Sequence, residues 1–134
     1  MASDVATRPA PALRIAAALM AALFLVAAAV QYNDPDPAYW IAIYGVAALL
    51  AARAAQGQLP LAPNAAALAA FTLLALRALP DLLGARAQAF ESWQMRSAED
   101  EVAREAGGLL LCALWSALQT VLAWRARQSG EEKR

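Results

Sequence analysis

The sequence predicts an all-α protein, an integral membrane four-helix bundle with both termini in the cytoplasm. Three observations support this prediction. Apolar residues make up 61% of the 134 residues. The charged residues are clustered, which leaves four long uncharged stretches at residues 15–33, 37–52, 54–76 and 106–124. The basic and acidic clusters also alternate along the chain, so that four crossings would place most bases on one side of a membrane and most acids on the other.

Each uncharged stretch approaches the length that a helix needs to cross the hydrocarbon core, about 20 apolar residues. A soluble bundle would need a polar stripe on every helix, and residues 16–30 and 106–124 have none. A cleaved signal peptide is the other interpretation of the first stretch, but that stretch is longer than most signal sequences. We therefore expect a transmembrane domain at residues 11–125, with a tail at 1–10 and a frayed tail at 126–134. Its spans are expected at about 12–31, 37–55, 64–83 and 104–124.

The composition excludes several classes of function. The chain has no histidine, which removes Ser-His-Asp and Cys-His catalysis and histidine-ligated metals. One cysteine cannot form a disulfide framework within the chain. The 11 basic and 11 acidic residues leave no excess positive charge for nucleic acid. We therefore expect a protein that is not an enzyme, has no cofactor and binds no nucleic acid.

The charge distribution predicts the orientation. With four spans, seven basic and three acidic residues lie on the side of the termini, and four basic and eight acidic residues lie on the other side. Because cytoplasmic loops are enriched in Arg and Lys, both termini are expected in the cytoplasm. Arginines outnumber lysines ten to one, as GC-rich bacterial codons tend to produce. The expected location is therefore a bacterial inner membrane, with the lipid bilayer as the first partner.

The turn after the first span has a distinctive sequence. Pro35 cannot continue the first helix, Asp36 suits the N-cap of the second helix, and Pro37 suits its first turn. A tight turn explains these residue types without any further function. Asn33, Asp34 and Asp36 also bring oxygen donors to the membrane surface, and hard cations such as Ca²⁺ or Mg²⁺ prefer such donors. The twelve-residue spacing of an EF-hand is missing.

Acidic residues also begin the fourth span. Glu101, Arg104 and Glu105 are three or four residues apart and therefore share a helix face. Acids at this position also stabilise the helix dipole. In a four-span bundle this end lies on the same side as the first turn. We therefore expect Asp34, Asp36, Glu101 and Glu105 to converge with Arg104 as their counter-charge. Carboxylates so close repel unless an arginine, a proton or a cation relieves them.

Arg77 lies near the outer end of the third hydrophobic stretch. An arginine at this depth either extends to the membrane surface or pairs with an acid inside the bundle. Asp34, Asp36 or Glu105 is the expected partner in the second case.

Other residues have simpler expected roles. Asn64 follows Pro63 and suits the N-cap of the third span, and residues 84–103 suit a short amphipathic helix on the outer surface. Cys112 is expected to pack as a small apolar residue. Glycines in the fourth span permit close helix contact, and its polar residues can bond between helices. These are Gly107, Gly108, Ser116, Gln119 and Thr120. The aromatic residues expected at the membrane interfaces are Tyr32, Tyr39, Trp40 and Trp124.

Two motifs resemble the transmembrane protein 220 family. The first is Gln31-Tyr32-Asn33-Asp34-Pro35-Asp36 followed by Trp40 and Tyr44, and the second is Arg104-Glu105-Ala106-Gly107-Gly108-Leu109 followed by Trp115. The resemblance covers spans one, two and four, whereas the third span and residues 84–98 show no matching motif. It implies a small multi-span membrane protein and supports treating the two motifs as one site. It implies no substrate, cofactor or catalytic residue.

The leading hypothesis is a non-enzymatic scaffold, assembly or partner-binding protein with an acidic cluster on its outer face. Its partner would be another membrane protein or a second copy of the chain. The alternative is a divalent-cation-binding or small-solute transport protein, with Asp34, Asp36 and Glu105 as candidate ligands and Arg77 as a deeper gate. Paired carboxylates acting on a lipid headgroup are a third interpretation, but no nucleophile or ligand motif accompanies them.

Overall fold

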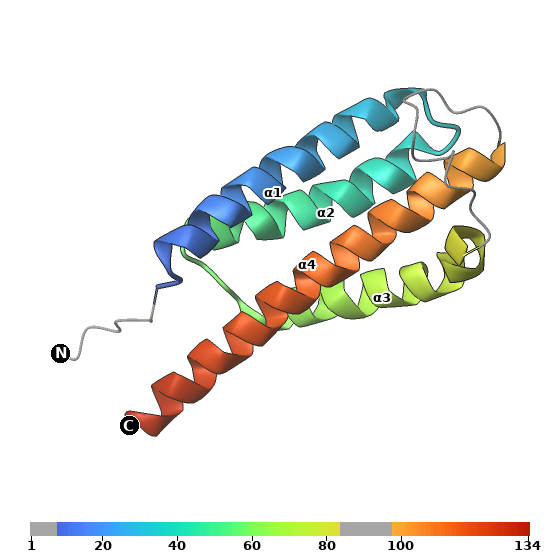
Figure 1. Ribbon diagram of the computed structural model, residues 1–134. Helices are drawn as coiled ribbons and strands as arrows, with labels where there is room; N and C mark the ends of the chain where they lie inside the picture. Colours follow the sequence, from blue (N-terminus) through green and yellow to red (C-terminus); the bar gives the residue numbers. More distant parts are fainter. Residues whose placement is uncertain (1–7, 84–97) are drawn as a thin grey trace.

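The structure, a computed structural model, describes residues 8–83 and 98–134. Within these ranges the chain is helical and contains no strand, which confirms the predicted fold class (Figure 1). The elements are α1 (Pro11–Ala29), the short 3₁₀ helix η1 (Val30–Asn33), α2 (Pro37–Ala55), α3 (Leu61–Leu83) and α4 (Ala98–Glu132). Four of the described helices are long and apolar enough to cross a membrane. The amphipathic helix expected at 84–103 lies largely outside the described residues.

The boundaries of α2 follow from its sequence. Asp36 occupies the N-cap position and Pro37 the first turn, as predicted, although the Asp36 side chain makes no capping hydrogen bond. At the other end Gly57 has a φ of +87°, a left-handed conformation that glycine adopts without steric cost. The N–H of Gly57 donates to the carbonyl of Ala54, and the next N–H donates to Arg53, each at 2.9 Å. This Schellman motif ends the helix.

The third helix begins earlier than predicted. It starts at Leu61, so Asn64 lies inside its first turn and is not its N-cap. Asn64 is buried, and its Nδ2 donates to the carbonyl of Pro60 at 2.7 Å. Pro63 is tolerated here because the first-turn N–H groups of a helix have no helical acceptor.

The fourth helix is longer than the predicted span at both ends. The polar residues after 125 continue it to Glu132, so the prediction of a frayed tail is wrong. Arg127 pairs with Glu131 at 3.5 Å, one turn later, and the Ser129 hydroxyl donates to the carbonyl of Arg125. At about 1.5 Å per residue these 35 residues exceed the thickness of a hydrocarbon core. One end of α4 therefore extends beyond the other helices (Figure 1).

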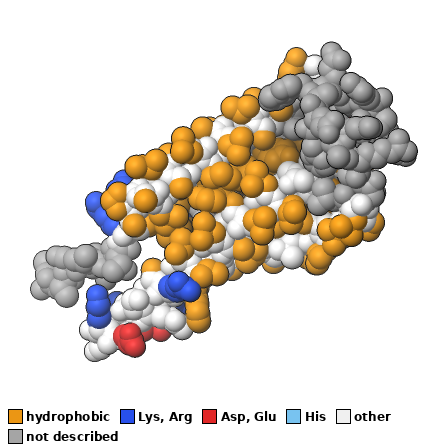
Figure 2. Space-filling view, viewed as in Figure 1, with side chains coloured by type: hydrophobic (Ala, Val, Ile, Leu, Met, Phe, Trp, Pro, Cys, Tyr) orange, Lys and Arg blue, Asp and Glu red, His pale blue; other side chains and the backbone are white. Residues whose placement is uncertain are grey.

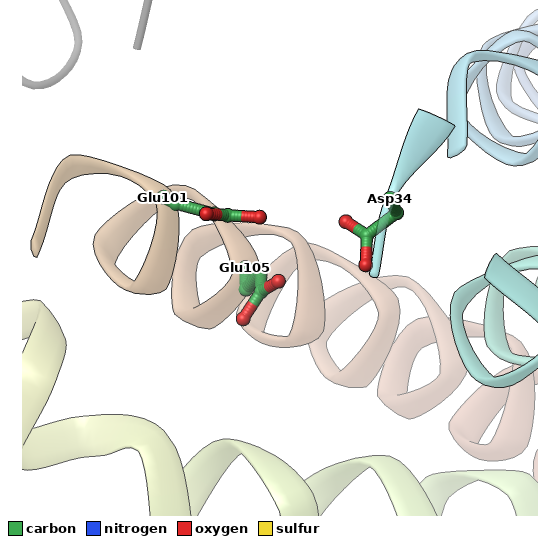
Figure 3. A group of neighbouring side chains, drawn as sticks. All are labelled: Asp34, Glu101 and Glu105. Carbon is green, nitrogen blue, oxygen red and sulfur yellow. The ribbon is translucent and has the colours of Figure 1, made fainter. Parts of the chain in front are cut away.

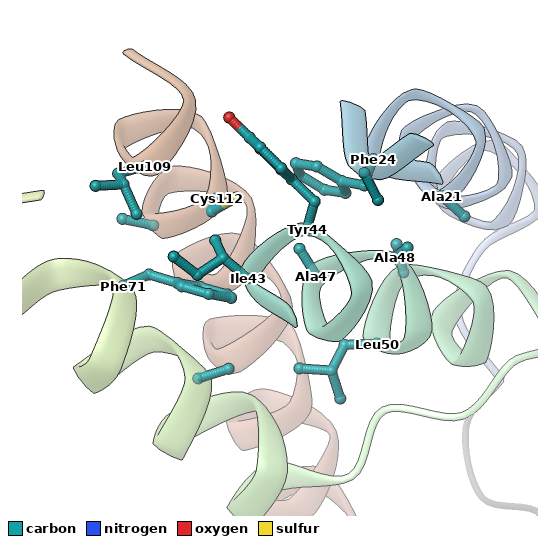
Figure 4. Packing of buried hydrophobic residues seen from close by; sticks show 14 of the residues in the cluster. Ala21, Phe24, Ile43, Tyr44, Ala47, Ala48, Leu50, Phe71, Leu109 and Cys112 are labelled. Carbon is teal, nitrogen blue, oxygen red and sulfur yellow. The ribbon is translucent and has the colours of Figure 1, made fainter. Parts of the chain in front are cut away.

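The bundle consists of two helical hairpins. α1 packs along α2 and α3 packs along α4, while α2 also contacts both α3 and α4 and so joins the hairpins. Phe24, Tyr44 and Phe71 fill the centre, surrounded by alanines that let the helix backbones approach closely (Figure 4). The termini lie at one end of the bundle, and the turn between α1 and α2 lies at the other, together with the start of α4 (Figure 1).

The outside of the bundle is largely apolar. Leu19 and Leu73, for example, are 68% and 69% exposed, and hydrophobic side chains are spread over the described part of the face in Figure 2. Only 22% of the most apolar window of α1 and 17% of that of α3 are buried. Such surfaces favour lipid or another apolar partner over water, and they agree with an integral membrane protein.

Candidate functional site

The turn after α1 positions Asp34. The 3₁₀ helix ends at Asn33, and Asp34 adopts an extended conformation (φ −72°, ψ 150°) that turns the chain toward α2. Its Oδ1 accepts a hydrogen bond of 2.9 Å from the backbone N–H of Asp36. This bond holds the carboxylate in place at the end of the bundle, where it stays partly exposed.

Asp34 meets two glutamates of α4. Glu101 and Glu105 lie one helical turn apart and so project from one face of the helix. One carboxylate oxygen from each of Asp34, Glu101 and Glu105 lies within 4.8 Å of the other two (Figure 3). All three side chains are partly buried. We call these three residues the acidic cluster; it joins the turn of the first hairpin to the second hairpin.

Trp40 connects α2 to the acidic cluster. Its side chain hydrogen-bonds to Glu105, and because an indole can only donate, the carboxylate accepts. Trp40 is buried. The centroid of its ring lies 5.2 Å from that of Tyr39, in an edge contact, and 6.2 Å from that of Tyr44. From the sequence, Trp40 is expected at the membrane interface and belongs to the first family motif, but a contact with Glu105 is not predicted. Its place in the first turn of α2, at the level of the carboxylates, is the signal that could have revealed this contact.

The charge of the acidic cluster limits what it can do. Three carboxylates at this separation repel one another unless a proton or a positive group lies among them. Ca²⁺–oxygen bonds of about 2.3–2.6 Å allow two ligand oxygens to lie up to about 5 Å apart, so the spacing is compatible with one cation. A basic side chain of a partner protein would satisfy the same oxygens.

The other predicted site residues lie around the acidic cluster. Asp36 and Asn33 are exposed, and the carboxylate of Asp36 is not one of the three that meet. Arg104 is partly buried on α4. Arg77 is exposed on α3 and, within residues 8–83 and 98–134, forms no ion pair with any of its predicted acidic partners.

A groove of about 340 Å³ adjoins the acidic cluster. It lies between α2, α3 and α4, and Glu105 belongs both to its wall and to the acidic cluster. The lining residues are Tyr39, Trp40, Leu74, Arg77, Ala78, Val102, Glu105 and Leu109. Arg77 and Glu105 therefore face one shared space although they do not pair.

Deeper in the bundle, α4 meets α2 at a close steric contact and at a hydrogen bond. Gly108 lies against the hydroxyl of Tyr44, so that a methyl group on this glycine would overlap the oxygen. Gln119 is buried and donates from Nε2 to the carbonyl of Leu50 at 3.1 Å. This bond confirms that a polar residue of the fourth span bonds between helices. Thr120 instead bonds within α4, to the carbonyl of Ser116.

Cys112 is fully buried on α4 and belongs to the apolar core, as the sequence predicts. A role missed by the sequence interpretation belongs to Arg14 of α1. Its Nε donates to the carbonyl of Ala55 at 2.9 Å and so caps the end of α2. A basic residue one span away from a helix end carries no sequence signal for this contact.

Comparison with known proteins supports the family resemblance. The model of the family described as "Transmembrane family 220, helix" matches residues 23–121. The matched range includes the third span, where the sequence interpretation found no matching motif. It includes Asp34, Trp40, Arg77, Glu101 and Glu105. No solved structure matches the chain.

Proposed function

The chain belongs to transmembrane family 220, and we propose that it is a non-enzymatic assembly protein that binds a protein partner through the acidic cluster. The observation that supports this proposal is the meeting of Asp34 with Glu101 and Glu105 at one end of the bundle. Their partly exposed oxygens would receive Arg or Lys side chains of a partner, which would relieve their mutual repulsion. The partner is another membrane protein or a second copy of this chain.

Two observations favour a non-enzymatic function. The sequence has no histidine, and Cys112 is fully buried. The thiol is therefore shielded from any substrate at the acidic cluster. Carboxylates can perform acid–base catalysis. Covalent catalysis also needs a nucleophile, which must be activated by an adjacent base or by a lowered pKa.

The proposed location is a bacterial inner membrane, with both termini in the cytoplasm. The excess of basic residues on the side of the termini supports this orientation through the positive-inside rule. The acidic cluster would then face the periplasm. The high ratio of arginine to lysine supports a bacterial source.

Loss of the acidic cluster should separate the protein from its partner. We expect the wild-type chain, extracted in mild detergent, to migrate on a native gel as a complex larger than the monomer. The double variant Asp34→Asn, Glu101→Gln should migrate as the monomer. The matched control Glu131→Gln, Glu132→Gln also removes two acids, from the exposed end of α4, and should leave the complex intact. A complex that survives in the Asp34→Asn, Glu101→Gln variant would contradict the proposal.

Divalent-cation binding is the second candidate function. It is favoured by the spacing of the three carboxylate oxygens, which lie within 4.8 Å of one another and could surround a single Ca²⁺ ion. The other ligands would be water or backbone oxygens. In this case the protein would be a cation-binding or transport protein, and a partner would not be needed to relieve the repulsion.

Thermal unfolding of the purified chain separates the two candidates. If the acidic cluster binds a cation, Ca²⁺, Mg²⁺ or Mn²⁺ at 100 times its Kd stabilises the folded state by about 2.7 kcal/mol and raises the Tm. The Glu101→Gln variant should lose this response, and the control Glu131→Gln should keep it. The cation candidate is rejected if none of the three ions shifts the Tm of the wild type.

A further inference from the structure

The groove next to the acidic cluster has walls of two kinds. Arg77 of α3 and Glu105 of α4 supply opposite charges at its outer level. Leu74 lies one turn before Arg77, and Leu109 lies one turn after Glu105. Because α3 runs toward this end of the bundle and α4 runs away from it (Figure 1), both leucines lie deeper in the membrane. The groove is therefore apolar on the bilayer-centre side of its two charged groups, while Val102, one turn before Glu105, adds an apolar side chain nearer the surface.

The two charged groups are both able to bind a ligand. Arg77 is exposed and forms no ion pair within the described ranges. A guanidinium presents several N–H donors in a plane and binds a phosphate with two parallel hydrogen bonds. Glu105 accepts a hydrogen bond from Trp40, and its two oxygens keep further acceptor sites. One space thus offers a phosphate-binding group and an ammonium-binding group on neighbouring helices.

We propose that this groove binds the headgroup of a phospholipid that carries a primary amine, namely phosphatidylethanolamine. Arg77 binds the phosphate, and Glu105 accepts hydrogen bonds from the ammonium group. Leu74 and Leu109 contact the first methylenes of the acyl chains. The lipid is favoured over a free phosphate compound because the two leucines lie deeper than the charged groups, as the acyl chains of a bilayer lie deeper than its headgroups.

The charges of the groove predict a rank order of lipids. Phosphatidylglycerol offers the phosphate without an amine, so it should contact Arg77 alone. Phosphatidylcholine offers a quaternary amine that has no N–H to donate to Glu105. Both should bind more weakly than phosphatidylethanolamine, by about tenfold for the loss of one charged hydrogen-bonding contact.

Native mass spectrometry of the purified full chain tests this proposal. The protein is mixed in detergent with equal amounts of the three lipids, and the retained adducts are counted. We expect about a tenfold excess of phosphatidylethanolamine on the wild type. Arg77→Gln should reduce retention of all three lipids, whereas Arg77→Lys should keep part of it. Glu105→Gln should abolish the preference for phosphatidylethanolamine over phosphatidylcholine.

Glu101→Gln is the matched control. Glu101 lies one turn before Glu105 and belongs to the acidic cluster, but it does not line the groove. This variant should retain the lipids as the wild type does, which separates the lipid proposal from the function proposed for the acidic cluster. Because Arg77 is exposed, its variants should unfold at the wild-type temperature. Equal retention of the three lipids by the wild type, or unchanged lipid retention in Arg77→Gln, would overturn the proposal.

Discussion

At the scale of single residues, the contact between Gly108 and Tyr44 sets how closely α4 approaches α2. A Cβ at Gly108 would overlap the tyrosine hydroxyl, and its next contact would be the ring carbon that bears this hydroxyl, at 3.1 Å. The glycine is needed here for space rather than for backbone freedom. Small residues serve the same purpose in many membrane helix contacts.

Replacement of Gly108 by alanine should destabilise the protein by about 1–3 kcal/mol, the usual effect of overpacking. Unfolding by denaturant in detergent micelles measures the loss. Adding Tyr44→Phe should restore part of it, because the atom nearest to the new methyl group is then absent. Gly45→Ala is the control, since nothing lies within 4 Å of a Cβ at Gly45. An equal loss in both glycine variants would rule out the steric explanation.

The buried side-chain amide of Gln119 forms a hydrogen bond through its nitrogen but not through its oxygen. Its Nε2 donates to the carbonyl of Leu50, while its Oε1 has no hydrogen-bond partner. The side-chain oxygen Oδ1 of Asn64 in α3 is also buried without a hydrogen-bond donor. The stabilisation from the Gln119 bond is therefore offset by a desolvated oxygen.

Gln119→Met should change the free energy of unfolding by less than about 1 kcal/mol. Interhelical hydrogen bonds in membranes average about 0.6 kcal/mol, and the substitution also removes the unbonded oxygen. Gln119→Ala should cost about 2–5 kcal/mol because it leaves a cavity. Gln128→Ala, at an exposed position of the same helix, should have no effect. If the methionine variant is as unstable as the alanine variant, the amide of Gln119 contributes more to stability than a single hydrogen bond does.

At the scale of elements, the end of α2 is held from two directions. Its own Schellman motif depends on the left-handed Gly57, and Arg14 of α1 caps the carbonyl of Ala55. The two interactions tie the first hairpin together at the end where the termini lie. They also leave few backbone carbonyls unsatisfied at the membrane boundary.

Gly57→Ala should lower stability by about 1–2 kcal/mol, because a Cβ is disfavoured in the left-handed conformation. Gly130→Ala provides the comparison, since Gly130 lies in α4 with a negative φ and open space around it. That variant should be as stable as the wild type or more stable. Thermal unfolding followed by circular dichroism measures both. If Gly57→Ala were as stable as the wild type, the turn would be able to adopt another conformation.

At the scale of the whole molecule, two hairpins meet mainly through α2. The turn of the first hairpin and the start of α4 then lie at one end, and both termini lie at the other (Figure 1). The acidic cluster depends on this arrangement, because Asp34 and Glu101 come from different hairpins. An odd number of crossings between them would separate these residues by the thickness of the bilayer.

Labelling of single cysteines with a membrane-impermeant maleimide tests this arrangement. In a Cys112→Ala background, Asp34→Cys and Glu101→Cys should both react in intact spheroplasts. Ser129→Cys, on the exposed end of α4, should react only after permeabilisation. Reaction of Asp34→Cys and Glu101→Cys from opposite sides would contradict the four-helix arrangement. If Ser129→Cys alone reacted from outside, the orientation would be the reverse of the proposed one, and the four-helix arrangement would still hold.

Much of the fold could be predicted because hydrophobic length and helix breakers are local properties. The second span, at 37–55, agrees with α2 at both ends, where Pro37 and Gly57 mark its limits. The predictions for Asn64 and for the C-terminal tail were wrong for a related reason. An asparagine after a proline can cap a helix or lie inside its first turn, and a polar segment can continue a helix that packing has already formed.

Local sequence is sufficient to predict four membrane spans, a proline-broken turn after the first and two acidic segments at one end, because crossing a bilayer requires helices of a certain length and apolar composition. The folded structure was needed to show that Asp34 meets Glu101 and Glu105 while Asp36 lies outside, and that Trp40 bonds to Glu105. It was also needed to show that Arg77 faces a groove and forms no ion pair with a described residue. These contacts depend on the rotation of each helix about its axis and on the packing of one hairpin against the other. Residues distant in the chain set both, so no local pattern contains them.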